Sequence, residues 1–110
     1  YPDDARGWHN LAVAMFMLGR YDEGFVAGHR AIDLSPGDAS TLFNLAVAAE
    51  RMKHFDEALR YARRGLKIDE RNAPLQRLEL RLRVLVQVDR VRRFWARLFA
   101  PSLGGSGLAG

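Results

Sequence analysis

The chain has 110 residues, about half of them apolar and none of them cysteine, so it can form one domain with a hydrophobic core and has no disulfides, as suits a cytoplasmic protein. It contains no apolar segment of membrane-spanning length and no recognisable signal segment, so the sequence predicts no membrane span. The net charge of +4 is concentrated in residues 56–110, but the arginines there are interleaved with acids and lack an aromatic stacking pattern, so nucleic acid is not the expected partner.

Residues 5–38 and 39–72 are two copies of one repeat that align without a gap. Trp8 of the first copy corresponds to Leu42 of the second, and Leu11 corresponds to Leu45. The four residues before the first copy, Tyr1-Pro2-Asp3-Asp4, look like a closing turn. We therefore expect residues 1–4 to end a preceding repeat or to form an N-terminal cap.

Each copy predicts two helices joined by a short turn. The apolar residues of the first half follow helical spacing, as in Trp8, Leu11, Met15 and Leu18. In the second half, small residues recur every three or four positions, which lets two helices pack closely as an antiparallel hairpin. The residues in question are Gly24, Gly28 and Ala31 in the first copy and Ala58, Ala62 and Gly65 in the second.

Residues 73–100 are ambiguous, because from Leu78 to Val88 apolar residues alternate with polar ones as in a strand. Pro74 at a helix start and the helical spacing of Leu75, Leu78 and Leu82 favour a helix. This helix either turns back near residues 87–89 as a degenerate third repeat or continues as one long C-terminal helix. Pro101 is expected to end it, and residues 101–110 are expected to form a flexible Gly/Ser-rich tail.

The two clear copies resemble the tetratricopeptide repeat, through Trp8, Leu11-Ala12, Met15 and Pro36 in the first and through Leu42, Leu45-Ala46, Phe55, Ala58 and Gly65 in the second. The resemblance implies an all-α fold, a right-handed solenoid of antiparallel helix hairpins. It also implies a protein or peptide partner. Gly28 and Ala62 depart from the family, which usually has a large aromatic residue at that position.

In the family, the first helices of successive hairpins line a concave groove, and matching positions give the groove residues of this chain. They are Arg6, His9, Asn10, Val13, Phe16, Met17, Phe43, Asn44, Val47, Arg51, Arg77 and Leu80. Some family members clamp a C-terminal carboxylate in this groove with Lys, Asn and Arg. Asn44 and Arg77 match two of those five positions, but His9, Val13 and Ala73 occupy the others, so we expect an apolar groove without such a clamp.

Enzyme chemistry is not expected, because the sequence has no phosphate-binding loop, dinucleotide fingerprint or nucleophile motif. Its three histidines lack metal-ligand spacing, so neither a metal nor another cofactor is expected.

Two functions remain open. The first is a scaffold that binds a peptide or an amphipathic helix in the apolar groove. The alternative is a self-assembly or docking module that forms a homodimer, or joins domains, through the apolar C-terminal helix, using Val84, Val88, Val91, Trp95, Leu98 and Phe99.

Overall fold

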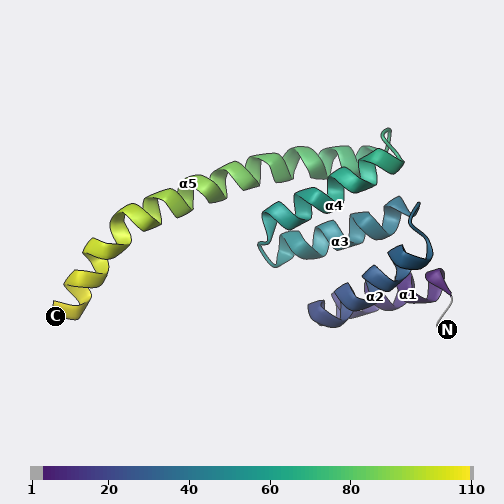
Figure 1. The fold of residues 1–110 in the computed structure, drawn as a ribbon, viewed down its shortest axis with the longest axis horizontal. Helices are drawn as coiled ribbons and strands as arrows, with labels where there is room; N and C mark the ends of the chain where they lie inside the picture. Colours follow the sequence, from purple (N-terminus) through teal and green to yellow (C-terminus); the bar gives the residue numbers. More distant parts are fainter. Residues whose placement is uncertain (1–3, 110) are drawn as a thin grey trace.

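The protein is an all-α array of helices, as the sequence predicts (Figure 1). The computed structural model describes the backbone of residues 4–109 and the side chains of residues 4–100. Its helices are α1 (Ala5–Met17), α2 (Tyr21–Leu34), α3 (Ala39–Arg51), α4 (Phe55–Ile68) and α5 (Ala73–Ala109). Helices α1 and α2 form one hairpin, α3 and α4 form the next, and α5 packs against α4.

Side chains at the helix starts explain where three of the helices begin. The carboxylate of Asp4 accepts a hydrogen bond from the backbone N–H of Arg6 at 3.0 Å, and Asp38 accepts one from the N–H of Ser40 at 3.0 Å. The side chain of Asn72 accepts from the N–H of Leu75 at 3.0 Å. Each bond satisfies a backbone donor that has no partner inside its helix, so these residues begin α1, α3 and α5.

The two hairpin turns share an unusual backbone conformation. Gly19 lies between α1 and α2 with φ of 76°, and Lys53 lies between α3 and α4 with φ of 63°. These residues occupy the same position in their repeats. Glycine adopts this left-handed conformation freely, whereas lysine meets a steric penalty from its Cβ. The repeat therefore keeps its turn geometry even where the glycine is missing.

A buried hydroxyl joins the first hairpin to the cap of the second. Thr41, only 1% exposed, donates a hydrogen bond from Oγ1 to Oδ2 of Asp38 at 2.8 Å. Nδ1 of His9 lies 2.7 Å from the same Oγ1. Since Thr41 has one hydroxyl proton and gives it to Asp38, the ring nitrogen of His9 must be the donor in the second bond. This chain of bonds fixes α1 against the start of α3.

We expect loss of this network to lower stability in a pH-dependent way. Partial burial by itself raises the pKa of Asp38, but hydrogen bonds from Ser40 and Thr41 outweigh burial and bring that pKa below its usual value of 3.8. The stabilisation is therefore present above pH 3.8 and is lost as the pH falls through the lowered folded-state pKa. Asp38→Ala should reduce the free energy of unfolding by about 1 to 2 kcal/mol at pH 7 and make urea midpoints less sensitive to acid.

Two variants complete this test. Thr41→Val keeps the shape of the side chain but removes the hydroxyl that binds Oδ2 of Asp38 and Nδ1 of His9, so it should reduce stability by about 1 to 3 kcal/mol. Ser40→Ala, at an exposed position of the same turn, keeps both backbone bonds to Asp38 and should have a smaller effect. Equal losses for the Thr41 and Ser40 variants would contradict the role of the buried hydroxyl.

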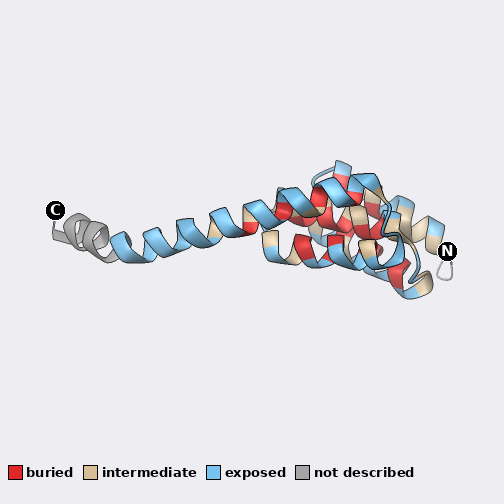
Figure 2. Ribbon diagram, turned by 90° about the horizontal axis from the view of Figure 1, so that it is seen from above, coloured by how far each residue is buried: buried red, intermediate tan, exposed pale blue. Residues whose placement is uncertain are grey.

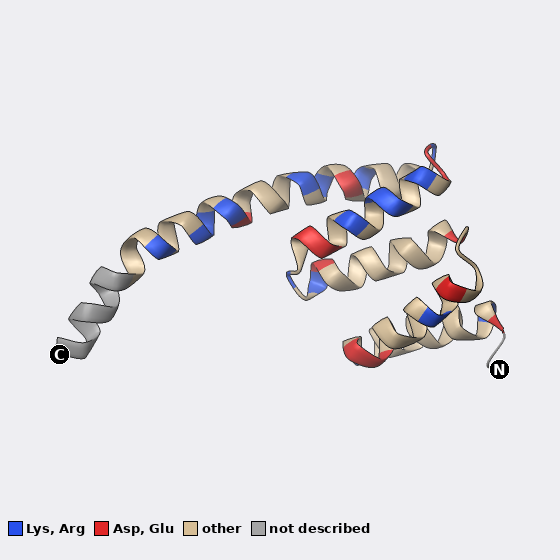
Figure 3. Ribbon diagram, in the orientation of Figure 1, with Lys and Arg blue, Asp and Glu red and all other residues tan. Residues whose placement is uncertain are grey.

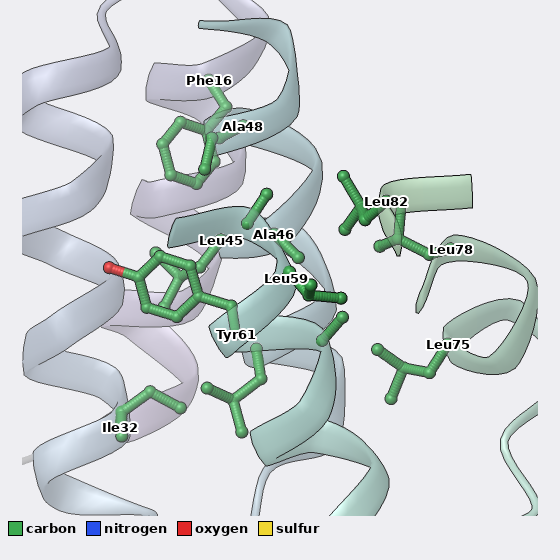
Figure 4. Packing of buried hydrophobic residues seen from close by; sticks show 14 of the residues in the cluster. Phe16, Ile32, Leu45, Ala46, Ala48, Leu59, Tyr61, Leu75, Leu78 and Leu82 are labelled. Carbon is green, nitrogen blue, oxygen red and sulfur yellow. The ribbon is translucent and has the colours of Figure 1, made fainter. Parts of the chain in front are cut away.

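The hydrophobic core runs along the array between neighbouring helices, as Figure 4 shows for part of it. Close approach of the helices depends on glycines that face leucines. A Cβ at Gly28 on α2 would lie 2.6 Å from Cδ2 of Leu45 on α3, and one at Gly65 on α4 would lie 2.8 Å from Cδ1 of Leu75 on α5. The leucine of the next helix therefore occupies the space that a larger residue would need.

Helix α5 extends well beyond the rest of the molecule and gives it a longest dimension of 58 Å (Figure 1). It is a single helix and does not turn back near residues 87–89. It also continues through Pro101 to Ala109, so the expectation that Pro101 ends the helix and that a linker follows was wrong. One proline removes only one hydrogen bond of the ladder, and a helix of 37 residues keeps the bonds on either side.

Candidate functional site

An apolar pocket of about 160 Å³ opens between α1 and α3. Seven of the predicted groove residues line this pocket. Helix α1 contributes Val13, Phe16 and Met17, and α3 contributes Phe43, Asn44, Val47 and Arg51. Tyr21, at the start of α2, and Ala48 complete the wall. We call this site the α1–α3 pocket.

The floor of the α1–α3 pocket is fixed by aromatic packing. Phe16 is 8% exposed, and its ring packs edge-on against Phe25 with centroids 5.3 Å apart. The ring of Tyr21 lies 6.2 Å from that of Phe16. Rings held in this way have few alternative rotamers, so the floor keeps its shape when the pocket is empty.

The rim of the pocket differs from its floor. Met17 is 80% exposed, so its flexible thioether side chain is free to fold over an incoming group. Asn44 is half-buried and Arg51 is exposed. Within the described part of the chain, neither of their side chains makes a hydrogen bond or an ion pair, so both are available to a ligand. The pocket thus offers an apolar cavity with an amide and a cation at its edge.

A second exposed surface runs along α5. We call it the α5 apolar face, and its members are between 46% and 56% exposed: Leu80, Val84, Val88, Val91, Phe94, Trp95, Leu98 and Phe99. Figure 2 shows that the described part of α5 beyond the body is almost entirely exposed. No helix in the described residues is long and apolar enough to cross a membrane.

A cluster of polar side chains joins α2 and α4. The hydroxyl of Tyr61 lies 2.9 Å from Nε2 of His29 and donates to Oε1 of Glu57 at 3.1 Å. Burial, and then the charge and hydrogen bond of Glu57, raise the pKa of Tyr61 to about 12. Tyr61 therefore stays protonated at neutral pH. Its hydroxyl connects α4 to α2 through His29. Among the residues that the structure describes, no three His, Asp or Glu side chains form a metal-binding group.

The family of the chain follows from a match over most of its repeats. The family model for the tetratricopeptide repeat matches residues 3–71, which is more than half of the chain. The chain belongs to the tetratricopeptide repeat family. The matched residues include α1 and α3, which form the pocket, whereas all of α5 lies beyond them.

Two curated proteins are similar in sequence to part of this chain. Hsp70-Hsp90 organizing protein 1 of Glycine max is 32% identical over 74 residues, covering 67% of this chain and 13% of that protein. The peroxisomal targeting signal receptor of Saccharomyces cerevisiae is 32% identical over 71 residues, covering 64% of this chain and 12% of that protein. The chain therefore spans only about an eighth of the length of these relatives.

Five residues expected in the tetratricopeptide groove lie outside the wall of the α1–α3 pocket. Arg6 and Asn10 are exposed on α1, and His9 is held by its bond to Thr41. Arg77 is exposed near the start of α5, and Leu80 lies on the other side of the array, where it lines a groove with Leu59 and Arg63 of α4. The reason is that α5 binds α4 through Leu75, Leu78 and Leu82, which turns Leu80 away from α3.

Sequence reasoning missed Tyr21 and Phe94. Tyr21 begins the second helix of its repeat, and the resemblance assigns the groove to first helices, so it was not considered. Tyr21 follows Phe16 by five residues, across the turn that contains Gly19. This tight turn is the signal that places the ring of Tyr21 beside that of Phe16. Phe94 lies next to Trp95 in the sequence, and its ring contacts that of Trp95 at 5.6 Å. A wheel drawn for a single long helix would have included it.

Proposed function

We propose that this chain is a non-catalytic protein-interaction module that holds an apolar peptide, or one face of an amphipathic helix, in the α1–α3 pocket. The observation that carries the proposal is the combination of a fixed aromatic floor with the exposed Met17 at the rim. Preformed apolar pockets with a few polar groups at the edge are typical binding sites for anchoring side chains. Arg51 at this edge favours a ligand with an acidic residue next to its apolar anchor.

The relatives support a binding role without defining the ligand. Their names describe an organizing protein and a targeting signal receptor, and both activities belong to proteins far longer than this chain. The residues that would clamp a terminal carboxylate are incomplete here, since Val13 contributes an apolar side chain to the pocket wall. We therefore propose an internal apolar segment as the ligand, in place of a free C-terminus.

Met17→Asp provides the sharpest test of the pocket. The residue is 80% exposed, so the substitution should leave the fold intact, yet a bound apolar group would have to desolvate the new carboxylate. We expect affinity for a synthetic amphipathic peptide with Leu and Phe on one face and Glu on the other to fall by roughly tenfold or more. Fluorescence anisotropy with the labelled peptide measures this change.

The controls separate the pocket from general surface effects. Val26→Asp places the same charge on the 69% exposed Val26 of α2, away from the pocket, and should leave affinity unchanged. Phe43→Asp and Val47→Asp are less informative, because both side chains also pack against the core. Equal affinity of wild type and Met17→Asp, or equal binding of a scrambled peptide, would exclude the pocket as the binding site.

Self-association through α5 stays a prediction. Support for it comes from the exposure of Val84, Val88 and Trp95 along one helix. Pairing two copies would bring their arginines together, which weighs against a tight dimer. Light scattering at tens of micromolar protein tests this directly, because a monomer at that concentration would exclude stable pairing.

A further inference from the structure

The α5 apolar face lies on the side of the helix opposite to the side that packs on the body. Leu78, Leu82 and Val86 are buried at 4% exposure or less, whereas Leu80, Val84 and Val88 are about half exposed. Residues two apart in a helix point about 200° from one another, so the two sets face in opposite directions. Over residues 80–98 the face is about 27 Å long. Leu80, Val84 and Val88 also border the groove beside Leu59 and Arg63 of α4. Past that groove α5 extends beyond the body, so a flat surface could contact the outer part of the face without meeting α1 to α4 (Figure 2).

The face broadens toward the far end of the described side chains. Phe94 and Phe99 are five positions apart, which places them about 140° from each other around the helix, with Trp95 and Leu98 between them. The ring of Trp95 stacks on that of Phe99 with centroids 5.4 Å apart. A two-helix seam uses a narrower stripe than this. A single partner helix would leave part of this aromatic group uncovered, whereas a planar interface would cover all of it.

The charge beside the face is net positive, and in the described part of the chain its two unpaired arginines lie toward the far end. Residues 80–100 contain six arginines and one acid, Asp89 (Figure 3). Four of these arginines have acidic partners: Arg81 lies 2.7 Å from Glu50, Arg83 lies 3.0 Å from Glu79, Arg93 lies 2.9 Å from Asp89, and Arg90 lies 3.7 Å from Asp56. Within the described residues, Arg92 and Arg97 have no acidic partner. A second copy would bring a matching set of arginines and repel the first, so the charge selects an anionic partner.

We propose that the α5 apolar face binds the surface of an anionic phospholipid bilayer, with the helix lying in the plane of the interface. Trp and Phe rings are well suited to the headgroup level, where their apolar bodies leave water, and long arginine side chains reach lipid phosphates from the flanks. Such binding needs no membrane-crossing helix. It also leaves the α1–α3 pocket, which α5 does not line, open to a peptide.

The test uses the complete chain with Trp8→Phe, so that Trp95 is the only fluorescent indole. Vesicles of phosphatidylcholine alone are compared with vesicles that also contain phosphatidylserine, by flotation and by tryptophan emission. We expect the protein to float with the anionic vesicles only, the emission of Trp95 to shift to shorter wavelength, and both effects to weaken at high salt. Failure to bind phosphatidylserine vesicles, or equal binding to both kinds, would overturn the proposal.

Two double variants identify the contacts. Trp95→Glu with Phe99→Glu should abolish flotation, and Arg92→Gln with Arg97→Gln should weaken binding by about 25-fold, which corresponds to about fivefold for each arginine. The matched controls, Val26→Glu on α2 and Arg30→Gln with Arg64→Gln, change exposed residues elsewhere and should bind as the parent does. Unchanged binding in the two α5 variants would contradict the assignment. A sedimentation dimer that is lost in Trp95→Glu, or a Trp95 shift with RNA but not with vesicles, would assign the face to another partner.

Discussion

Leu45→Ala is expected to reduce the free energy of unfolding by about 2 to 5 kcal/mol, because Leu45 is fully buried and faces the glycine of the preceding hairpin. A domain of this size has a total stability of about 5 to 15 kcal/mol, so this one change removes a large share of it. Urea unfolding followed by circular dichroism measures the loss. Leu80→Ala makes the same chemical change at a 55% exposed position and should alter stability by about 0.5 kcal/mol or less.

A partner substitution at Gly28 makes this prediction specific to the contact. Gly28→Leu alone overfills the space occupied by Leu45 and should reduce stability by about 1 to 3 kcal/mol. Combined with Leu45→Ala, the new side chain fills the vacated volume, so the double variant should be more stable than the two separate losses predict, by about 0.5 to 3 kcal/mol. Strict additivity of the two losses would contradict direct packing of Gly28 against Leu45.

Leu82→Asp is expected to release α5 from the body. Leu82 has no exposed surface, and an unpaired carboxylate in its place should destabilise the α4–α5 interface by about 3 to 5 kcal/mol. Helices in a repeat array depend mainly on their neighbours, so hydrogen exchange should rise most in residues 73–89, less in α4, and least in α1 and α2.

Val84→Asp supplies the matched control for this release. Val84 lies two residues from Leu82 but is 56% exposed, so the same charge there should leave exchange in α4 and α5 near that of the parent. A uniform rise of exchange over all helices in Leu82→Asp would show that the array unfolds as one cooperative unit. That result would contradict neighbour-dependent stability.

The fold was predictable where sequence pattern and repeat agreed. The in-register copies predict four helices, and Asp38 indicates where one of them begins. Whether residues 73–100 form one helix or two was not predictable. The segment carries apolar residues on two opposite sides, and its sequence near Gln87 has no glycine to indicate a turn. Pairing with α4 uses one side through Leu82, and nothing in the local sequence says that the other side stays uncovered.

The candidate site could be predicted in part, and for a similar reason. Position matching found most of the α1–α3 pocket, because Phe16 and Phe43 lie on helices that the repeat aligns. It failed for Leu80, whose direction depends on how α5 is rotated against α4. It also gave no reason for the departure at Gly28. The structure supplies the reason, since Leu45 from the next repeat fills the space in place of an aromatic residue.

The recurrence of one left-handed turn at Gly19 and Lys53 bears on the construction of longer arrays from this chain. The second hairpin keeps the geometry of the first although its residue bears a Cβ, so the surrounding helices impose the turn conformation. Residues 5–38, which have the glycine, are thus the better unit to duplicate in an engineered tandem protein. Each added unit would contribute a Gly28 that receives Leu11 of the next unit, because Leu11 occupies the repeat position of Leu45.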